Sequence, residues 1–580
     1  MTFDLTTLTD SRVVGQATAR LARHLGFLYN EQRELVVAAA ACAIAVLANG
    51  SVCFDLTRAN QLRCEADPPP ALDWPDPEQW AELLKSSPMV ATDPDVRDRP
   101  LVLDQSAVYL TRYWAEQQTI VERLTARLGQ PPPVVDGLDG ALDRVFARDS
   151  EQREAARQAA ASWFSVIAGG PGTGKTTVVA QILEVLARAG SPRNGLRVTL
   201  TAPTGRAAAR LDQAVRTKLA ESGSASPIRC RSGTIHRVLG LKPWGAVDHD
   251  SSHPLAADVV VVDEASMLSL HLMAVLLDAV GPATRLVLLG DADQLASVEA
   301  GVVLADIVAN AGIVPVTRLS RNFRNSGTIA DLADAIRRGA EDEALSILEH
   351  PDDKIEWCRA DLDSADSVEG LASLRQDVTR QSLDMIEASQ SGDAVAALGL
   401  LDSHRLLVAH RRGVGHWAQT TRGWIARQPG SPALSARWYP GLPVLITRND
   451  DLMGVFNGDC GVIVRHGDDL KLAIDSGSEV RLISPDMVES WEPLYASTIH
   501  KAQGSQYDRV SLILPGPATA LLTRELFYTA VTRAKEFLRV IGSPAAVRHA
   551  IASPALRASG LASQLSVSRA TGRSTDGRSK

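Results

Sequence analysis

The chain has 580 residues, of which 45% are hydrophobic and 22% charged, a composition typical of a globular protein with roughly three to five domains. It contains no run of about 18 apolar residues, no basic-then-apolar N-terminus and no C-x-x-C pair, so we expect a cytoplasmic protein without a membrane span, secretory signal or disulfide framework. The net charge of −8 excludes a uniformly basic nucleic-acid-binding protein.

Residues 1–110 form the first predicted unit, which combines a helical stretch at 20–49 with an acidic, proline-rich segment. From Glu65 to Asp104 there are ten acidic residues against three basic ones, and residues 68–100 include eight prolines. Because proline fixes the backbone and removes a donor, we expect this segment to be extended and poorly packed internally. Its acidity predicts that it faces a protein or solvent rather than DNA, and in a multi-subunit enzyme the N-terminal unit would be the docking surface. The rest of the chain is nearly neutral, at −1, which is compatible with a DNA path made of local basic and hydroxyl groups.

From residue 164 onward, apolar β-prone runs alternate with helical stretches. This alternation predicts the α/β class, with parallel sheets covered by helices on both faces. We expect two such lobes, at 111–330 and 331–563, with a small antiparallel β domain inserted in the second at about 440–490. Residues 564–580 are rich in Ser, Arg and Gly and are predicted to be a disordered tail. The expected buried strands are 164–168, 197–202, 258–262, 285–290, 405–409, 509–514 and 538–542.

A glycine-rich segment follows the first of these strands and precedes a helix. It fits the pattern G-x-x-x-x-G-K-[ST], in which backbone N–H groups surround the β-phosphate of a nucleotide. The lysine would neutralise the β- and γ-phosphates, and the hydroxyl after it would bind Mg²⁺. A chance glycine-rich turn is the alternative, which the strand–loop–helix context disfavours. The predicted ATP-binding residues here are Gly169, Gly170, Pro171, Gly172, Thr173, Gly174, Lys175, Thr176 and Thr177.

Two adjacent carboxylates end the predicted strand at 258–262. Asp263 would hold Mg²⁺, and Glu264 would orient and deprotonate the water that attacks ATP. Acidic residues at a strand end are more often helix caps, but their position about ninety residues after the glycine-rich loop favours the catalytic interpretation.

Two amides and two arginines complete the predicted nucleotide site. Gln294 is suited to sense the γ-phosphate and Gln152 to contact adenine, although either could be an ordinary solvated side chain. Arg324 and Arg533 are candidate arginine fingers, and surface salt bridges are their alternative. If both arginines reach one γ-phosphate, the nucleotide must lie between the two lobes.

Taken together, these motifs resemble superfamily-one DNA helicases and, within them, the RecD family, the α subunits of exodeoxyribonuclease V (RecBCD). The resemblance covers residues 152–564. Ala296 stands where stand-alone RecD-like helicases usually have proline, and the N-terminal unit lacks the glycine-punctuated hairpin repeats of those enzymes. Gln506-Tyr507 replaces the usual Glu-Phe, which leaves the role of those two side chains open. The matching segments are 202–208, 234–240, 290–301, 457–461, 498–505, 525–534 and 559–561.

The resemblance implies two RecA-like lobes that hydrolyse ATP with Mg²⁺ and move 5′→3′ on single-stranded DNA at duplex ends. It also implies a hairpin insert at about 237–257, holding Trp244, that splits the duplex, and an SH3-like fold for the second insert. Gly504 joins the nucleotide-binding set. The implied DNA-binding residues are Pro203, Thr204, Thr234, His236, Thr498 and His500.

Three functions fit this reading. The first is the motor subunit of a helicase–nuclease for double-strand-break repair, bound to RecB-like and RecC-like subunits in a heterotrimer. A stand-alone RecD-like helicase and a nucleotide-gated DNA-binding switch that does not move are the alternatives. The sequence contains no compact Asp/Glu/Lys cluster outside the ATP motifs, so we expect any nuclease activity to reside in another subunit.

Overall fold

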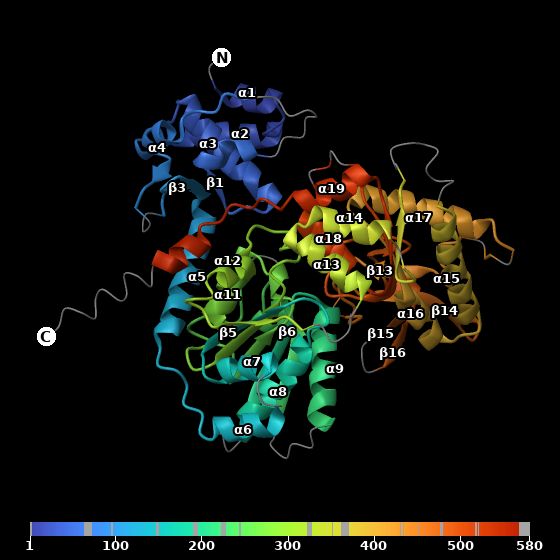
Figure 1. Ribbon diagram of the computed structural model, residues 1–580. Coiled ribbons are helices and arrows are strands. Elements are labelled where there is room, and N and C mark those ends of the chain that lie inside the picture. Colours follow the sequence, from blue (N-terminus) through green and yellow to red (C-terminus); the bar gives the residue numbers. More distant parts are fainter. Residues whose placement is uncertain are drawn as a thin grey trace.

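The computed structural model shows four β-sheets, each with helices around it (Figure 1). No helix within the described part of the chain is long and apolar enough to cross a membrane. The residues described are 3–62, 72–93, 97–146, 150–189, 195–221, 228–242, 245–321, 327–350, 352–360, 371–429, 431–432, 434–450, 452–475, 479–516, 519 and 521–567.

The first lobe is built on a six-stranded parallel sheet with strand order β10-β5-β9-β8-β6-β7. Alternate residues of each strand face opposite sides, as the pleat requires. Val260 and Val262 of β8 pack into one hydrophobic core and Val259 and Val261 into another. The predicted helix-covered parallel sheet is therefore confirmed. Its strands are β5 (Phe164–Gly169), β6 (Leu196–Ala202), β7 (Ile228–Thr234), β8 (Val259–Val262), β9 (Arg285–Gly290) and β10 (Val316–Leu319).

Helices on both faces cover this sheet. The long helix α5 packs along α11, and Arg127 at its end donates hydrogen bonds to the carbonyls of Thr284 and Gly281. Between α10 and β8, where a hairpin insert is predicted, the described residues form bends and loop without a strand, and Trp244 lies outside the described residues. The helices are α5 (Thr111–Gly129), α6 (Leu138–Val145), α7 (Glu151–Ala160), α8 (Lys175–Arg188), α9 (Gly205–Glu221), α10 (Ile235–Leu239), α11 (Leu270–Ala279) and α12 (Val303–Ala309).

The second lobe is also a parallel sheet, with strand order β11-β20-β19-β12-β18. Its strands are β11 (Ile355–Cys358), β12 (His404–Val408), β18 (Ser497–Thr498), β19 (Tyr507–Ile513) and β20 (Ala534–Ile541). Its helices are α13 (Thr328–Arg338), α14 (Glu341–Glu349), α15 (Ala372–Gln390), α16 (Ala394–Ser403), α17 (Arg411–Ala426), α18 (Arg524–Val531) and α19 (Pro544–Ala552).

A five-stranded antiparallel sheet interrupts the second lobe between α17 and β18. Its strand order is β16-β15-β14-β13-β17, and all its neighbouring strands are antiparallel. It forms where the sequence predicts an inserted β domain. The strands are β13 (Pro443–Ile446), β14 (Cys460–His466), β15 (Asp469–Asp475), β16 (Val480–Ile483) and β17 (Trp491–Pro493).

The N-terminal unit is more tightly packed than its composition suggests. A four-stranded sheet, β1-β4-β3-β2, accompanies its helices, and Trp80 within the acidic segment is 1% exposed. The expectation of a poorly packed segment is therefore wrong for residues 72–93 and 97–104, because their apolar side chains complete the core that α3 begins. The elements are α1 (Leu5–Asp10), α2 (Gln16–Leu28), α3 (Glu34–Ala45), β1 (Cys53–Asp55), α4 (Pro77–Lys85), β2 (Val90–Ala91), β3 (Leu101–Asp104) and β4 (Ala107–Leu110).

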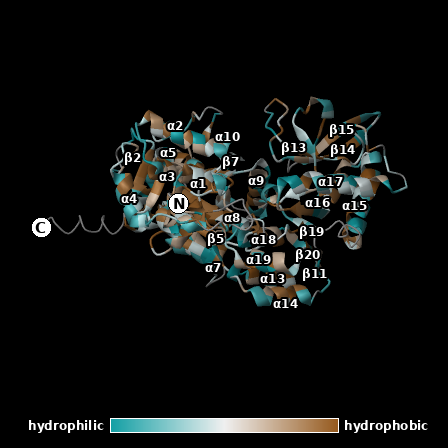
Figure 2. Cartoon of the chain, turned by 90° about the horizontal axis from the view of Figure 1, so that it is seen from above, coloured by the Kyte–Doolittle hydropathy of each residue, from teal (hydrophilic) through white to brown (hydrophobic). Residues whose placement is uncertain are grey.

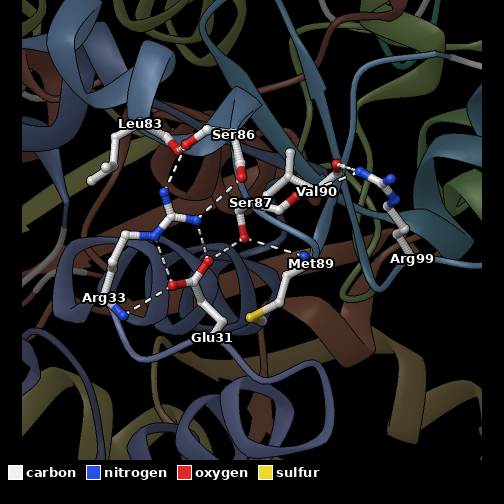
Figure 3. Close-up of polar contacts among 8 residues, drawn as sticks. All are labelled: Glu31, Arg33, Leu83, Ser86, Ser87, Met89, Val90 and Arg99. Carbon is white, nitrogen blue, oxygen red and sulfur yellow. Dashed lines mark hydrogen bonds and ion pairs between the residues drawn. The ribbon is translucent and has the colours of Figure 1, made fainter.

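An ion pair in the α2–α3 connection, between the partly exposed Arg33 and the buried Glu31, is hydrogen-bonded to the residues that follow α4 (Figure 3). The guanidinium of Arg33 donates to both carboxylate oxygens of Glu31, at 2.8 and 2.5 Å, and Ser87 Oγ donates to Glu31 Oε2 at 2.6 Å. Arg33 Nη1 donates to Ser86 Oγ at 2.7 Å. The hydrogen bonds from Arg33 lower the pKa of Glu31 to about 2. The carboxylate of Glu31 therefore holds this part of the unit together.

We expect Glu31→Gln to lower the stability of the N-terminal unit by about 2 kcal/mol at pH 7, the scale of a hydrogen-bonded charged group. Since the folded-state pKa lies below the unfolded value near 4.5, this stabilisation is complete above pH 4.5 and is lost as pH falls toward 2. Urea unfolding at a series of pH values from pH 7 to about pH 2, which spans the predicted loss, measures the difference. Glu82→Gln, at an exposed pair with Lys85, is the control. An equal loss in both variants would contradict the prediction.

The C-terminal segment leaves α19 and crosses back to the first lobe and the N-terminal unit (Figure 1). Residues 561–567 are helical, and Leu565 is buried in the core of the first lobe. The side chain of Gln564 accepts hydrogen bonds from Gln117 and Gln118 of α5. The predicted tail boundary at Gln564 is therefore too early, because Leu565 is buried and Ser566 Oγ donates to Asn310 Oδ1 at 2.7 Å.

Candidate functional site

The predicted nucleotide-binding residues meet at one edge of the first sheet. Strands β5, β9 and β8 are parallel neighbours, so their carboxyl ends lie side by side. In open parallel sheets this edge is where ligands bind. The glycine-rich loop follows β5, Asp263 and Glu264 follow β8, and the segment that contains Gln294 follows β9.

The glycine-rich loop curls at the start of α8. Gly172 and Gly174 have φ values of +82° and +83°, a conformation that side chains with a Cβ rarely adopt. Lys175 Nζ donates to the carbonyls of Gly169 and Gly170, at 2.6 and 3.0 Å, so the ammonium lies inside the loop. The loop thus presents N–H groups, a helix N-terminus and one cation, which suits an anionic phosphate.

Asp263, the first of the two carboxylates after β8, lies close to Lys175. Burial and the neighbouring charge of Glu264 raise the pKa of Asp263 to about 6, and the charge of Lys175 opposes this rise. Glu264 has a φ of +52°, a strained backbone for a residue with a side chain. A cation bound beside these carboxylates would stabilise their charged forms. Oxygen ligands of this kind, with phosphate oxygens, are what Mg²⁺ prefers.

Gln294 and Arg533 connect the two lobes. Arg533 lies just after α18, is 2% exposed, and its Nη2 donates to Gln294 Oε1 at 3.2 Å. Its other guanidinium atoms donate to the carbonyls of Thr529 at 2.9 Å and Ser505 at 3.1 Å. Burial lowers the pKa of Arg533, while the nearby charge of Glu264 opposes this effect. The arginine is therefore a buried, oriented cation at the lobe boundary and not a surface salt bridge.

Further residues that the sequence did not predict form hydrogen bonds across the lobe boundary. Tyr528 Oη donates to Asp291 Oδ2 at 2.9 Å, and Gln503 Nε2 donates to the Leu295 carbonyl at 2.8 Å. The Leu295 N–H donates to Thr529 Oγ1 at 2.9 Å. Each of these bonds joins one lobe to the other. All five residues stand within or beside the quoted motifs, but no local pattern shows that they pair.

A cavity of about 430 Å³ lies beside this network. Its lining comes from the glycine-rich loop, from the segment after β9 and from α13 and α18 of the second lobe. It therefore opens between the lobes, where a nucleotide held by the loop could reach both. Lining residues include Gly170, Thr173, Asp293, Arg337, Tyr528 and Thr532.

For two predicted nucleotide contacts, Gln152 and Arg324, the structure shows no position at the cavity. Gln152 lies half-buried in the first turn of α7 and does not line the cavity. Its neighbour Glu151 accepts hydrogen bonds from the backbone of Ser320 and Arg321 after β10, which fixes α7 near this edge of the sheet. Arg324 lies outside the described residues. The roles of both residues stay predictions.

The threonines predicted to bind DNA each cap a turn of helix. The hydroxyl of Thr204 accepts from the Ala207 N–H at 3.2 Å, that of Thr234 from the Arg237 N–H at 3.3 Å, and that of Thr498 from the Lys501 N–H at 3.2 Å. Capping accounts for threonine at these positions without any ligand. His236 is exposed and His500 half-buried, and partial desolvation by the surrounding protein lowers the pKa of both side chains. Pro203 directly precedes Thr204 at the end of β6.

Three family models match the chain. Residues 11–109 match the RecBCD enzyme subunit RecD N-terminal domain, residues 147–358 an AAA domain, and residues 493–541 the UvrD-like helicase C-terminal domain. These three matches cover, in order, the N-terminal unit, the glycine-rich loop with the carboxylates, and the segment that holds Arg533.

Curated relatives include RecD subunits and a related helicase. The chain is 41% identical over 570 residues to the RecBCD enzyme subunit RecD of Mycolicibacterium smegmatis, covering 96% of this chain and 98% of that one. It is 29% identical to the ATP-dependent RecD2 DNA helicase of Deinococcus radiodurans, covering 77% of this chain and 58% of that one. A Bacteroides Pif1 helicase structure with ADP-AlF3 and ssDNA has 15% identity and a TM-score of 0.37, covering 70% of this chain and 93% of that one. On the identity and coverage of the M. smegmatis match, the chain belongs to the RecD family of RecBCD enzyme subunits.

Proposed function

We propose that this chain is an ATP-dependent, 5′→3′ DNA helicase that serves as the motor subunit of a RecBCD-type helicase–nuclease. The observation that carries the proposal is the buried contact between Gln294 and Arg533 across the lobe boundary, next to the glycine-rich loop. A cation supplied by the second lobe and a phosphate loop supplied by the first allow one nucleotide to hold both lobes together.

The residues take the following roles. Lys175 and the loop N–H groups bind the phosphates, and Thr176 and Asp263 would hold Mg²⁺, which would neutralise phosphate charge. Glu264 orients and deprotonates the attacking water, Gln294 senses the γ-phosphate, and Arg533 stabilises charge in the transition state.

Movement follows from the loss of these γ-phosphate contacts. With ATP bound, the loop and Arg533 hold the lobes together, and hydrolysis with phosphate release lets them separate, as in other hinge-type switches. The ends of β6, β7 and β18 carry the DNA-binding candidates and belong to different lobes. If the two lobes alternate in their grip on phosphates, each cycle moves the strand in one direction.

A polarity assay on tailed duplexes tests this function. The chain, alone and with its RecB-like and RecC-like partners, is mixed with duplexes that carry either a 5′ or a 3′ single-stranded tail. We expect ATP-dependent strand displacement from the 5′ tail and a DNA-stimulated ATPase. A DNA-stimulated ATPase without displacement in any assembly would support a nucleotide-gated switch instead. Full displacement by the monomeric chain would support the stand-alone helicase.

The exposed face of α2 is the proposed docking surface for a partner subunit. Phe27 is 81% exposed and Leu28 60% exposed, next to the exposed basic residues Arg20, Arg23 and His24. Large exposed apolar side chains that lie together mark protein interaction sites. The neighbouring charges favour an apolar partner surface with acidic residues at its rim.

We expect the double variant Phe27→Asp/Leu28→Asp to lose co-purification with the partner subunits, because two charges would be buried without partners. The loss should be at least about tenfold, or roughly 1.4 kcal/mol, in affinity. Analytical ultracentrifugation of the mixed subunits measures it. Val134→Asp, at an 88% exposed apolar residue between α5 and α6, is the control. Unchanged assembly of the double variant would exclude α2 from the interface.

A further inference from the structure

Helix α9 connects a predicted DNA contact to the second lobe through two arginines. It begins directly after Thr204 and carries Arg206 and Arg210 one turn apart, on the same face. Arg206 forms an ion pair with Asp402 at the end of α16, and Arg210 Nη1 donates to the Gly504 carbonyl at 2.7 Å. Figure 2 shows α9 between the first sheet and α16. Both arginines belong to the first lobe and both acceptors to the second.

The acceptor of Arg210 lies against the hydrolysis site. A Cβ placed on Gly504 would stand 3.7 Å from Glu264 Cγ and 3.9 Å from Glu264 Oε1, so Gly504 faces this carboxylate and a side chain there would contact it. The next carbonyl, that of Ser505, accepts from Arg533 Nη1. Two arginines from different lobes therefore bind two consecutive carbonyls. Arg210 binds that of Gly504, beside Glu264, and the predicted arginine finger Arg533 binds that of Ser505.

The contacts of Arg206 and Arg210 with the second lobe lie beside a cavity, which allows them to transmit movement between the lobes. Arg210 is partly open to solvent, and the surrounding protein and the charge of Arg206 lower its pKa, whereas the charges of Asp402 and Glu264 oppose this lowering. A cavity of about 540 Å³, lined by Arg206, Arg210 and Asp402, borders the contact. Because one side of these contacts is open rather than close-packed, the arginine side chains can follow a displacement of either lobe.

We propose that Arg210 is a positioning residue that couples DNA binding at the start of α9 to ATP hydrolysis, by placing the 504–505 carbonyls relative to Glu264 and Arg533. The inference rests on the proposed motor function and deepens it. DNA bound at residues 203–205 displaces α9, and the hydrogen bond from Arg210 carries that displacement to the loop that orients the finger. Arg210 contacts neither nucleotide nor DNA in this scheme, and it acts only through Gly504.

The test compares Arg210→Ala and Arg210→Lys with Arg216→Ala. Arg216 lies on the same helix and pairs with Asp212 at 2.8 Å on the exposed surface, so it is a matched control. We expect Arg210→Ala to reduce the ratio of DNA-stimulated to basal kcat on the order of tenfold, within the usual range of coupling between two sites. The Kd for single-stranded DNA without nucleotide should change by less than about twofold. Arg210→Lys should recover part of the ratio, because an ammonium can still donate to the carbonyl.

The outcomes separate this inference from the proposed function. A wild-type chain without DNA-stimulated ATPase would overturn the proposed function and the coupling with it. If DNA stimulates ATP hydrolysis equally in the wild-type chain and in the Arg210→Ala variant, only the coupling would be overturned. The coupling would also be overturned if Arg210→Ala lowered basal and DNA-stimulated kcat equally, or if Arg216→Ala lowered the ratio as much as Arg210→Ala does. Either result would assign Arg210 a purely structural role. If Arg210→Ala does not fold, Arg210→Lys takes its place. A ratio of DNA-stimulated to basal kcat below that of the wild type would support the coupling, and an unchanged ratio would overturn it.

Discussion

Lys175→Gln is expected to abolish ATP hydrolysis and strand displacement together. Glutamine is one atom shorter than lysine but keeps an uncharged N–H donor that faces the carbonyls of Gly169 and Gly170, which Lys175 Nζ contacts at 2.6 and 3.0 Å. The loop therefore keeps its shape while the positive charge that stabilises the β- and γ-phosphates is lost. Removal of one preorganised donor typically lowers kcat by about 10²–10³-fold, and loss of a full charge should do at least as much.

Steady-state ATPase with saturating single-stranded DNA measures this effect, alongside displacement of a 5′-tailed duplex. Lys218→Gln, which removes an exposed ammonium that pairs with Glu221 on α9, should leave both activities within about twofold of wild type, since exposed pairs are worth little. Thermal unfolding checks that both variants fold. A Lys175→Gln chain that displaces DNA at the wild-type rate would show that the glycine-rich loop is not the motor's nucleotide site.

Arg533→Lys should have the second largest effect. An arginine finger contributes about 10³–10⁵ in rate, and lysine keeps the charge but cannot reach Gln294, Ser505 and Thr529 at once. We expect kcat to fall by about 10³-fold while the KM for ATP changes far less, because the finger acts in the transition state. A change confined to KM would instead indicate ground-state binding of the nucleotide.

Two controls accompany this variant. Arg524→Lys alters an arginine at the start of the same helix, α18, which donates to the Ile551 carbonyl at 2.8 Å, away from the lobe boundary. It should hydrolyse ATP normally. Gln294→Ala combined with Arg533→Lys should be less damaging than the sum of the two single changes, since the two side chains act through one contact. Hydrolysis by Arg533→Lys within about tenfold of the wild-type rate would remove Arg533 from the catalytic group.

Local patterns predicted the phosphate loop and most of the strands. The glycine-rich loop depends on consecutive residues, and Val259–Val262 is an apolar run that only a buried strand accommodates. Strand β7 escaped prediction because Ile228–Thr234 is polar and half-exposed, with no apolar run to reveal it. The packing of the acidic segment in the N-terminal unit was predicted wrongly for a related reason. Its prolines and charges dominate the composition, while Trp80 and its neighbours supply the core.

The sequence by itself determined the α/β class, the order of its elements and the groups that suit ATP chemistry, because these depend on neighbouring residues and short periods. Only the tertiary structure decided which distant groups meet. Gln294 and Arg533 are 239 residues apart, and Arg210 and Gly504 are 294 apart. Such contacts depend on strand order and on how two lobes pack. Side-chain periodicity records which face of an element is buried, but not which other element covers it.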